Sequence, residues 1–334
     1  MIRRIVQPLA PHRTDLAFAL WFLNPLVIFV SGIHGQFDVI VVPFILLALI
    51  LTNEKRYALS GVALTIATLF KLYPLFLFPL YLTLILKQST TGKQKVISSA
   101  HFAVASLVTA ILLTLPYLSS SNIWTAMFRR GDTLSLQGGF NVWFAAQSIK
   151  IEHWLTGTNA SILVKIVPLA ALAMIIMIPI AIMRQKLNLK TIIAGHLAIM
   201  IILFCYYSSL ANPQYFLSVI AFLVIYVAVY NKYSLSLWII SIFGIAQYLL
   251  LATFAWKILL YPLAAYTPLL DVDDINRQLI GTPAQWIYWR NHPLVNPYIY
   301  SSGIGFFATT SVLIGCLKTI SRQRSNNNHT SNHD

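Results

Sequence analysis

Acidic residues are scarce in this chain. Asp and Glu occur nine times in 334 residues, against 23 Lys and Arg, and charged residues make up 10% of the sequence. Soluble globular domains carry about 25% charged residues. The shortage excludes an ordinary soluble domain. It also makes each acid informative, because an ionisable group inside an apolar chain is costly and is by default a functional hypothesis.

Cysteine and recognisable catalytic patterns are sparse as well. Cys205 and Cys316 both fall inside apolar runs, so they predict neither a disulfide framework nor a metal site. No phosphate-binding glycine loop, internal repeat or interpretable Ser–His–Asp spacing occurs. We therefore expect no cofactor. The acidic string Asp271–Asp274 could hold a divalent cation with a sugar phosphate, and the alternative for it is a helix cap or solvated charge.

Apolar sequence is what the chain has in abundance. Apolar residues make up 58% of it, and its mean hydropathy is +0.73. Runs close to the roughly 20 residues that cross a bilayer recur along its length. They predict an all-α, polytopic transmembrane helical bundle of about ten spans with two long outer loops. The expected spans are residues 16–33, 37–52, 58–70, 74–87, 97–117, 161–183, 191–210, 214–230, 233–254 and 299–318.

The basic residues predict the orientation of these spans. The net charge of +14 would suit nucleic acid only if it gathered in one patch. The basic residues instead lie in short segments between apolar runs, and alternating spans put fifteen of the 23 on one side. The positive-inside rule makes that side cytoplasmic, with both termini. We expect no nucleic-acid partner, a single membrane domain over residues 1–320, and a polar cytoplasmic tail without regular structure over 321–334. Of the possible membranes, the plasma membrane of a prokaryote is favoured over the endoplasmic reticulum.

One stretch has two interpretations. Residues 58–87 could form a single helix kinked at Pro74 and Pro79, which would reverse every later span. Two short arms meeting near Lys71 would instead keep Lys55 and Lys87 on the cytoplasmic side. In the second case Lys71 and Asp38 share the outer face. The alternative role for Lys71 is a side chain that snorkels to the interface.

The polar string His34–Asp38 lies between the first two apolar runs. An acid at that position lies at the membrane surface or in a cavity that opens onto it. The other interpretation is a polar turn that only ends a helix, with Gly35 as its breaker.

Two further motifs lie on the expected outer side. Arg129 and Arg130 are adjacent in a loop where basic residues are otherwise few, and a guanidinium pair suits a phosphate or pyrophosphate. The alternative is charge that keeps the loop soluble. Asn141 follows in the same loop, and Gln214 belongs to a polar, proline-broken turn over 212–216.

Taken in order, these motifs resemble the GT-C superfamily of polytopic glycosyltransferases. The resemblance covers roughly residues 20–217 and rests on five strings: Asn24-Pro25, His34–Asp38, Lys71–Pro74, Arg130 to Trp143, and Asn212–Phe216. The chain looks most like the bacterial and archaeal mannosyltransferase-like branch. It is also similar to the dolichyl-phosphate-glucose-dependent enzymes of asparagine-linked glycosylation, whose His-Gly-His-Phe-Gln string resembles residues 34–38.

The resemblance implies an activity and a set of site residues. A member would move a mannose-like hexose from a polyprenyl-phosphate carrier to a lipid or glycan acceptor at the outer face, among membrane lipids. Asp38 is the acid that could assist the acceptor hydroxyl, and cations near the phosphate would stabilise the departing charge. The expected substrate-binding residues are His34, Gln36, Lys71, Tyr73, Arg129, Arg130, Asn141 and Gln214.

The chain departs from the superfamily at its start. Members carry the catalytic acid in a first outer loop ahead of the Asn-Pro helix, whereas this sequence begins at that helix. We expect the family acid to be absent, through truncation, a partner that supplies it, or loss of activity. Two alternatives to an enzyme remain: a transporter or flippase of a lipid-linked glycan, and a non-catalytic partner of a split glycosyltransferase.

Overall fold

The computed structural model describes residues 1–33, 35, 38–117, 140–142, 145, 158–186, 188–207, 213–251 and 297–330. All regular structure within these ranges is helical, and no strand occurs in them. Five of the described helices are long and apolar enough to cross a membrane, or six if the bent pair Pro11–Phe22 and Pro25–Ile33 counts as one span. The all-α bundle is confirmed and is consistent with a multi-pass membrane protein, while the count of about ten spans stays a prediction.

The helices follow the expected apolar runs closely. The first half holds α1 (Ile2–Val6), η1 (Pro11–Arg13), α2 (Thr14–Phe22), α3 (Pro25–Ile28), η2 (Phe29–Ile33), α4 (Asp38–Asn53), α5 (Tyr57–Phe70), η3 (Tyr73–Leu77), α6 (Phe78–Gln88), α7 (Gly92–Thr114) and η4 (Leu115–Tyr117). The second half holds α10 (Thr158–Met183), α11 (Leu189–Ile202), η7 (Leu203–Tyr207), η8 (Pro213–Tyr215), α12 (Phe216–Tyr230), α13 (Ser234–Leu251) and α17 (Pro297–Thr330).

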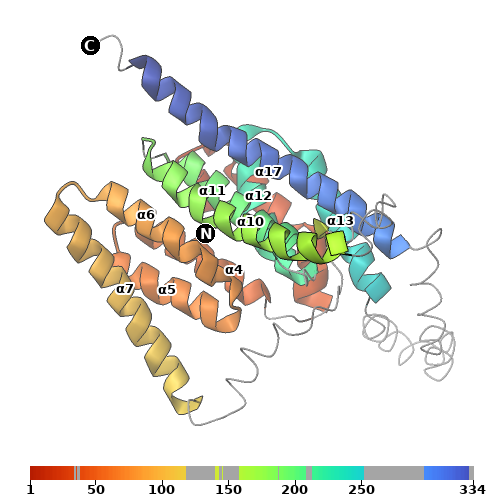
Figure 1. Ribbon diagram of the computed structural model, residues 1–334, viewed down its shortest axis with the longest axis horizontal. Helices are drawn as coiled ribbons and strands as arrows, with labels where there is room; N and C mark the ends of the chain where they lie inside the picture. The colour runs from red at the N-terminus through yellow and green to blue at the C-terminus, as the bar shows by residue number, and fades with distance from the viewer. Residues whose placement is uncertain are drawn as a thin grey trace.

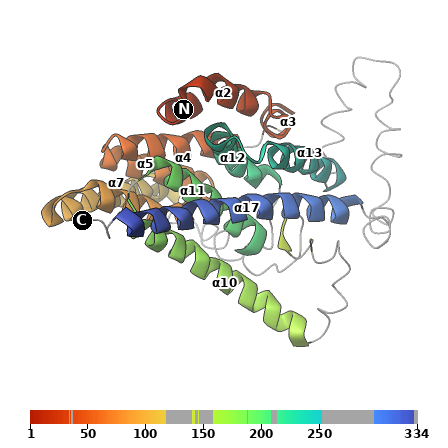
Figure 2. The ribbon, with the colours of Figure 1, turned by 90° about the horizontal axis from the view of Figure 1, so that it is seen from above.

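The core of the bundle lies around α11 and α12. Of the apolar stretch that ends in η7, 83% is buried, and of the stretch that contains α12, 78% is buried. The corresponding share is only 17% for α7, which lies at the edge of the group formed by α4 to α7 (Figure 1). α17 runs along the second group of helices, beside α11 and α13 (Figure 2). The edge helices α7 and α10 therefore present apolar surface to the surroundings, as helices in contact with lipid do.

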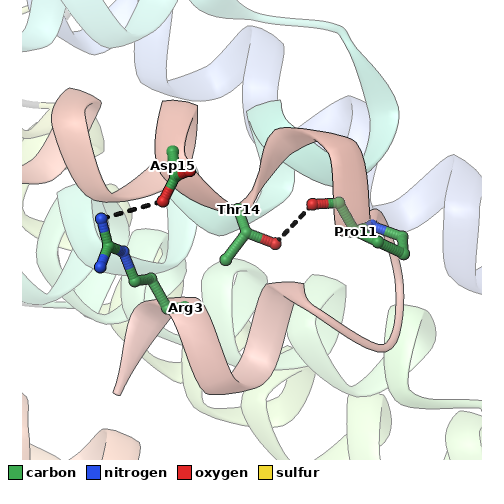
Figure 3. Close-up of polar contacts among 4 residues, drawn as sticks. All are labelled: Arg3, Pro11, Thr14 and Asp15. Atoms are coloured by element: carbon green, nitrogen blue, oxygen red, sulfur yellow. Dashed lines mark hydrogen bonds and ion pairs between the residues drawn. The ribbon is translucent and has the colours of Figure 1, made fainter.

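The chain begins with a short amphipathic helix. Ile2, Ile5 and Val6 of α1 are buried against the bundle, whereas Arg3 and Arg4 are exposed. Arg3 pairs with Asp15 at 2.9 Å, next to a hydrogen bond of 2.9 Å from the Thr14 hydroxyl to the Pro11 carbonyl (Figure 3). Such exposed ion pairs contribute about 0–1 kcal/mol each, so the buried apolar side chains hold α1 in place.

Residues 57–88 form two arms rather than one kinked helix. The Tyr57 hydroxyl at the start of α5 donates to Gln88 Oε1 at the end of α6, at 3.2 Å. The far ends of the two arms therefore meet, and the chain reverses between them at η3. Lys55 and Lys87, which flank these ends, lie on the same side of the bundle. The expectation of two short arms meeting near Lys71 is confirmed.

Several helix ends gather on that same side. The Lys87 ammonium donates to the carbonyl oxygens of Met183, at 2.9 Å, and of Gln185. A cation at the carboxyl end of α10 is favoured by the helix dipole. The Gln185 amide in turn donates to the Ile320 carbonyl of α17 at 2.6 Å. The ends of α6 and α10 are thereby joined to Ile320 of α17, on the side where the charge rule places the cytoplasm.

The tail differs from expectation. α17 continues to Thr330, so the structure contradicts a tail without regular structure over residues 321–330. The sequence has neither Gly nor Pro between Cys316 and Thr330. A helix that has already been nucleated elongates readily through such a stretch, even when it is polar.

Candidate functional site

The Asn24-Pro25 motif breaks the first span and restarts it. α2 ends at Phe22 and α3 begins at Pro25, with a bend of 46° between the two halves. The Asn24 side-chain oxygen accepts the backbone N–H groups of Leu26 and Val27, at 3.0 and 3.3 Å. Its amide donates to the Ser241 hydroxyl of α13 at 2.7 Å. The motif is therefore a helix cap that also fixes α3 against α13, and the helix is interrupted there instead of continuous.

The described residues around the polar string mark the end of one helix and the start of the next. Phe29–Ile33 forms a π-helical turn, and Gly35 has a φ of +62°, which a residue with a side chain adopts only at a cost. α4 then begins at Asp38. The described residues fit a break between two helices, with the acid at the start of the second one. A functional role for Asp38 stays a prediction. His34 and Gln36 lie outside the described residues.

Asp38 and Lys71 form an ion pair inside the bundle. The Lys71 ammonium lies 3.4 Å from Asp38 Oδ2. The Asp38 side chain is fully buried, whereas 23% of the Lys71 side chain is exposed. The start of α4 favours the negative charge through the helix dipole. The expectation that these two residues share a face is confirmed.

Aromatic rings surround the ammonium side of this pair. The Lys71 ammonium lies 5.1 Å from the centroid of the Tyr215 ring, within the range of a cation–π contact. The Tyr73 ring meets Phe204 edge-on at 5.1 Å and lies 6.3 Å from Tyr215. Phe204 and Tyr215 stack at 5.8 Å. We call Asp38, Lys71, Tyr73, Phe204 and Tyr215 the Asp38 cluster.

A short piece of the outer loop is inserted next to this cluster. Phe140 is fully buried, and its ring meets Phe216 edge-on at 5.0 Å. Phe216 in turn lies 5.8 Å from Phe204. Gly305 of α17 makes room for the Phe140 ring, because a Cβ at that position would collide with it. Asn141 is buried along with Phe140, so the loop enters the bundle between α12 and α17.

The structure brings only part of the expected site together. Asp38, Lys71 and Tyr73 lie in one cluster, and Gln214 directly precedes its Tyr215. Asn141 is held at the neighbouring loop insertion. Arg129, Arg130 and the Asp271–Asp274 string lie outside the described residues. The roles of all these residues in binding or catalysis stay predictions.

Two members of the cluster were not singled out from the sequence. Tyr215 lies in the quoted Asn212–Phe216 string, and its position beside Lys71 could have been suspected from the shared outer face. Phe204 is one aromatic residue within an apolar run and carries no local signal. Within the described ranges no group of three or more His, Cys, Asp or Glu residues could hold a metal ion.

The carboxylate of Asp38 is the group in the cluster that could bind a ligand. Neither Asp38 oxygen accepts a hydrogen bond from any residue that the structure describes. A carboxylate can accept about four such bonds, so the site has capacity for donors from a ligand.

Comparison with known families places the first part of the chain. Residues 5–131 match the model of the family described as PIG-U, GPI transamidase subunit. The match covers less than half of the chain and includes Asn24, Asp38 and Lys71. No curated protein matches the chain. PIG-U is a GT-C-like family of multispan membrane proteins, in agreement with the superfamily resemblance, but the match does not support a mannosyl- or glucosyltransferase branch.

The expectation of a hexosyltransferase is therefore wrong. The matched family is a subunit of GPI transamidase, which joins a peptide to a glycolipid and does not move a hexose from a carrier. The motifs led to the wrong prediction because their residues have structural roles. Asn24 caps a broken span, Gly35 turns the chain, and Lys71 neutralises Asp38, and none of these roles requires glycosyl-transfer chemistry. A polyprenyl-phosphate sugar donor has no support from the match.

Proposed function

We propose that this chain is a non-catalytic membrane subunit of a GPI transamidase-like complex. In this role it holds a lipid-linked glycan near the outer face of the membrane, where a catalytic partner acts on it. The sequence offered a similar alternative, a non-catalytic partner of a split glycosyltransferase. Here the complex transfers a peptide instead of a sugar.

The observation that carries the proposal is where the family match falls. The matched segment, residues 5–131, contains the broken first span and both members of the buried ion pair. A subunit that binds and positions needs such a polar site, and it needs no catalytic base of its own.

The surroundings of Lys71 support a ligand that arrives through the membrane. Phe70 and Leu72, its neighbours in sequence, are 45% and 55% exposed, and Leu75 is 47% exposed. Exposed apolar residues of this kind suit acyl chains better than water.

The proposal also changes the expected location. A GPI transamidase subunit acts in the endoplasmic reticulum, so the outer face of the bundle becomes the lumenal face. This runs against the plasma membrane of a prokaryote, and it keeps both termini in the cytoplasm.

Association with other subunits tests the proposal. The chain, tagged at its C-terminus, is purified from its own membranes in a mild detergent, and the co-purifying chains are identified by mass spectrometry. We expect a stable complex whose other members match further GPI transamidase subunits. Isolation of the chain by itself, with hexose transfer from a polyprenyl-phosphate sugar, would contradict the proposal.

A further inference from the structure

The buried carboxylate of Asp38 has fewer hydrogen-bond donors around it than it could accept. The Asp38 side chain is fully buried, and neither of its oxygens accepts a hydrogen bond from the described residues. Its counter-charge lies 3.4 Å away, which is longer than the roughly 2.7–2.9 Å of a close charge-assisted hydrogen bond. Buried carboxylates are usually satisfied by several donors. Within the described residues, Asp38 therefore keeps acceptor capacity that Lys71 does not fill.

The Lys71 ammonium occupies a position suited to any primary ammonium. It lies between a carboxylate oxygen at 3.4 Å and the face of the Tyr215 ring at 5.1 Å. Carboxylates and aromatic faces both attract a cation. Lys71 directly follows α5 in an extended conformation, and 23% of its side chain is exposed. Its flexible four-carbon chain can therefore move outward without a change in the helices.

Charge balance restricts what can take the place of the Lys71 ammonium. A simple anion that drew Lys71 away would leave Asp38 buried without a counter-charge, which is strongly unfavourable. A simple cation on Asp38 would leave Lys71 without one. A ligand that carries both an ammonium and a phosphate satisfies both residues, because its ammonium pairs with Asp38 and its phosphate pairs with Lys71. The total charge of the site is the same before and after the exchange.

We propose that Asp38, Lys71 and Tyr215 form a binding site for a phospholipid head group that carries a phosphate and a primary ammonium. The ammonium lies against Asp38 and the Tyr215 ring, and the phosphate pairs with Lys71. The acyl chains follow the exposed Phe70 and Leu72. The inference goes beyond the proposed function, because it concerns a lipid of the bilayer and requires no catalytic partner.

A primary ammonium is distinguished from a quaternary one by its N–H groups. The Asp38 oxygens need hydrogen-bond donors, and a trimethylated ammonium has none. The aromatic ring alone would accept both kinds of cation. Preference for the primary ammonium therefore reports contact with Asp38 rather than with the ring.

Lipid retention by the purified chain tests the site. The full chain is reconstituted in nanodiscs that contain equal amounts of phosphatidylethanolamine, phosphatidylcholine and phosphatidylglycerol. It is then extracted into detergent, and bound lipids are measured by native mass spectrometry. We expect phosphatidylethanolamine to be retained at least about tenfold over each of the other two, a difference that corresponds to about 1.4 kcal/mol.

Three variants make the test specific. Lys71→Met leaves Asp38 without its counter-charge, so this variant could fail to fold. The double variant Asp38→Asn/Lys71→Met removes both charges together and is expected to fold, with its preference lost. Arg3→Gln removes an exposed ion pair elsewhere and should retain the preference. Equal retention of the three lipids by the unaltered chain, or an unchanged preference in the double variant, would overturn the proposal.

A further arm identifies the source of the head group. Lipids that co-purify with the chain from its own membranes are extracted and their masses determined. A diacyl phospholipid with a primary ammonium supports the bilayer as the source. A larger glycolipid with the same pair of charges as the only bound species would overturn that assignment, and so would the absence of any lipid with a primary ammonium.

Discussion

At the scale of single residues, the site depends on one charge compensating another. Asp38 and Lys71 are 33 positions apart and are joined only because the chain reverses at η3. Their closeness could be anticipated from the sequence, since the charge rule and the two prolines near Lys71 put both on the outer face. The aromatic part of the cluster could not be anticipated. Phe204 and Tyr215 come from segments far along the chain, and no local pattern predicts which aromatic residues converge.

Because Asp38 and Lys71 form an ion pair, we expect the effects of their substitutions on the free energy of unfolding to be strongly coupled. Lys71→Met alone leaves a buried carboxylate unpaired, and we expect it to destabilise the chain by about 3–5 kcal/mol. Asp38→Asn/Lys71→Met should cost clearly less than Lys71→Met alone, because no buried charge is left over. The free energies come from reversible denaturant unfolding in detergent micelles. Additive effects of the two single substitutions would show that the pair is not coupled.

At the scale of helices, glycines mark close approaches. α5 packs on α7 at Gly61, where a Cβ would collide with the carbonyl oxygen of Phe102 and the hydroxyl of Ser106. The backbone of α7 cannot give way as a flexible side chain could. The sequence shows where each helix lies, because long apolar runs need no partner to be recognised. It does not show which glycine meets which helix, since that depends on how the spans pack.

Gly61→Ala and Gly92→Ala form a matched pair of substitutions. Gly61 lies inside α5, where Ala is favoured over Gly by about 1 kcal/mol, and Gly92 is the first residue of α7. A Cβ at Gly92 meets nothing within 4 Å. We therefore expect Gly92→Ala to leave the melting temperature unchanged or slightly raised, and Gly61→Ala to lower it by several degrees. Equal melting temperatures for the two variants would mean that the α5–α7 contact tolerates the added methyl group.

The broken first span offers a second prediction at this scale. Asn24→Ala removes the cap of α3 and the hydrogen bond to Ser241. Loss of a cap costs about 0.5–2 kcal/mol, and the loss of a buried partner adds to it. We expect Asn24→Ala to be destabilised by about 1–3 kcal/mol. Asn188→Ala removes only the cap contact to Lys190, so it should cost less. A smaller loss for Asn24→Ala than for Asn188→Ala would contradict the link to α13.

At the scale of the whole molecule, the charge distribution predicts the topology. The expected alternation of spans would put fifteen of the 23 basic residues on one side. On that side, Lys87 and Gln185 connect α6, α10 and α17. The apolar runs and the basic segments between them are visible in the order of the residues, so the all-α class and the places of the helices could be predicted from the sequence. The activity could not be predicted in this way, because Asn24 caps a helix and Lys71 pairs with Asp38, and neither role depends on a particular reaction.

Cysteine labelling tests the topology directly. Cys205 and Cys316 are both buried and should react slowly with a polar maleimide. Single cysteines are introduced by Ser120→Cys and Ser325→Cys, and sealed vesicles of known orientation are labelled from each side. We expect Ser120→Cys to react from the outer or lumenal side and Ser325→Cys from the cytoplasmic side. Reaction of both cysteines from the same side would contradict the predicted orientation of the spans between them.

The central claim is that the chain holds a lipid-linked glycan for the catalytic partner of its complex and does not itself catalyse sugar transfer. Peptide transfer to a glycolipid, measured in membranes from which this chain has been depleted, tests it most directly. The account predicts that transfer is lost on depletion, returns when the chain is restored, and is reduced when Asp38→Asn/Lys71→Met is restored at equal abundance. Full peptide transfer in depleted membranes, together with the loss of a hexose transfer, would contradict it.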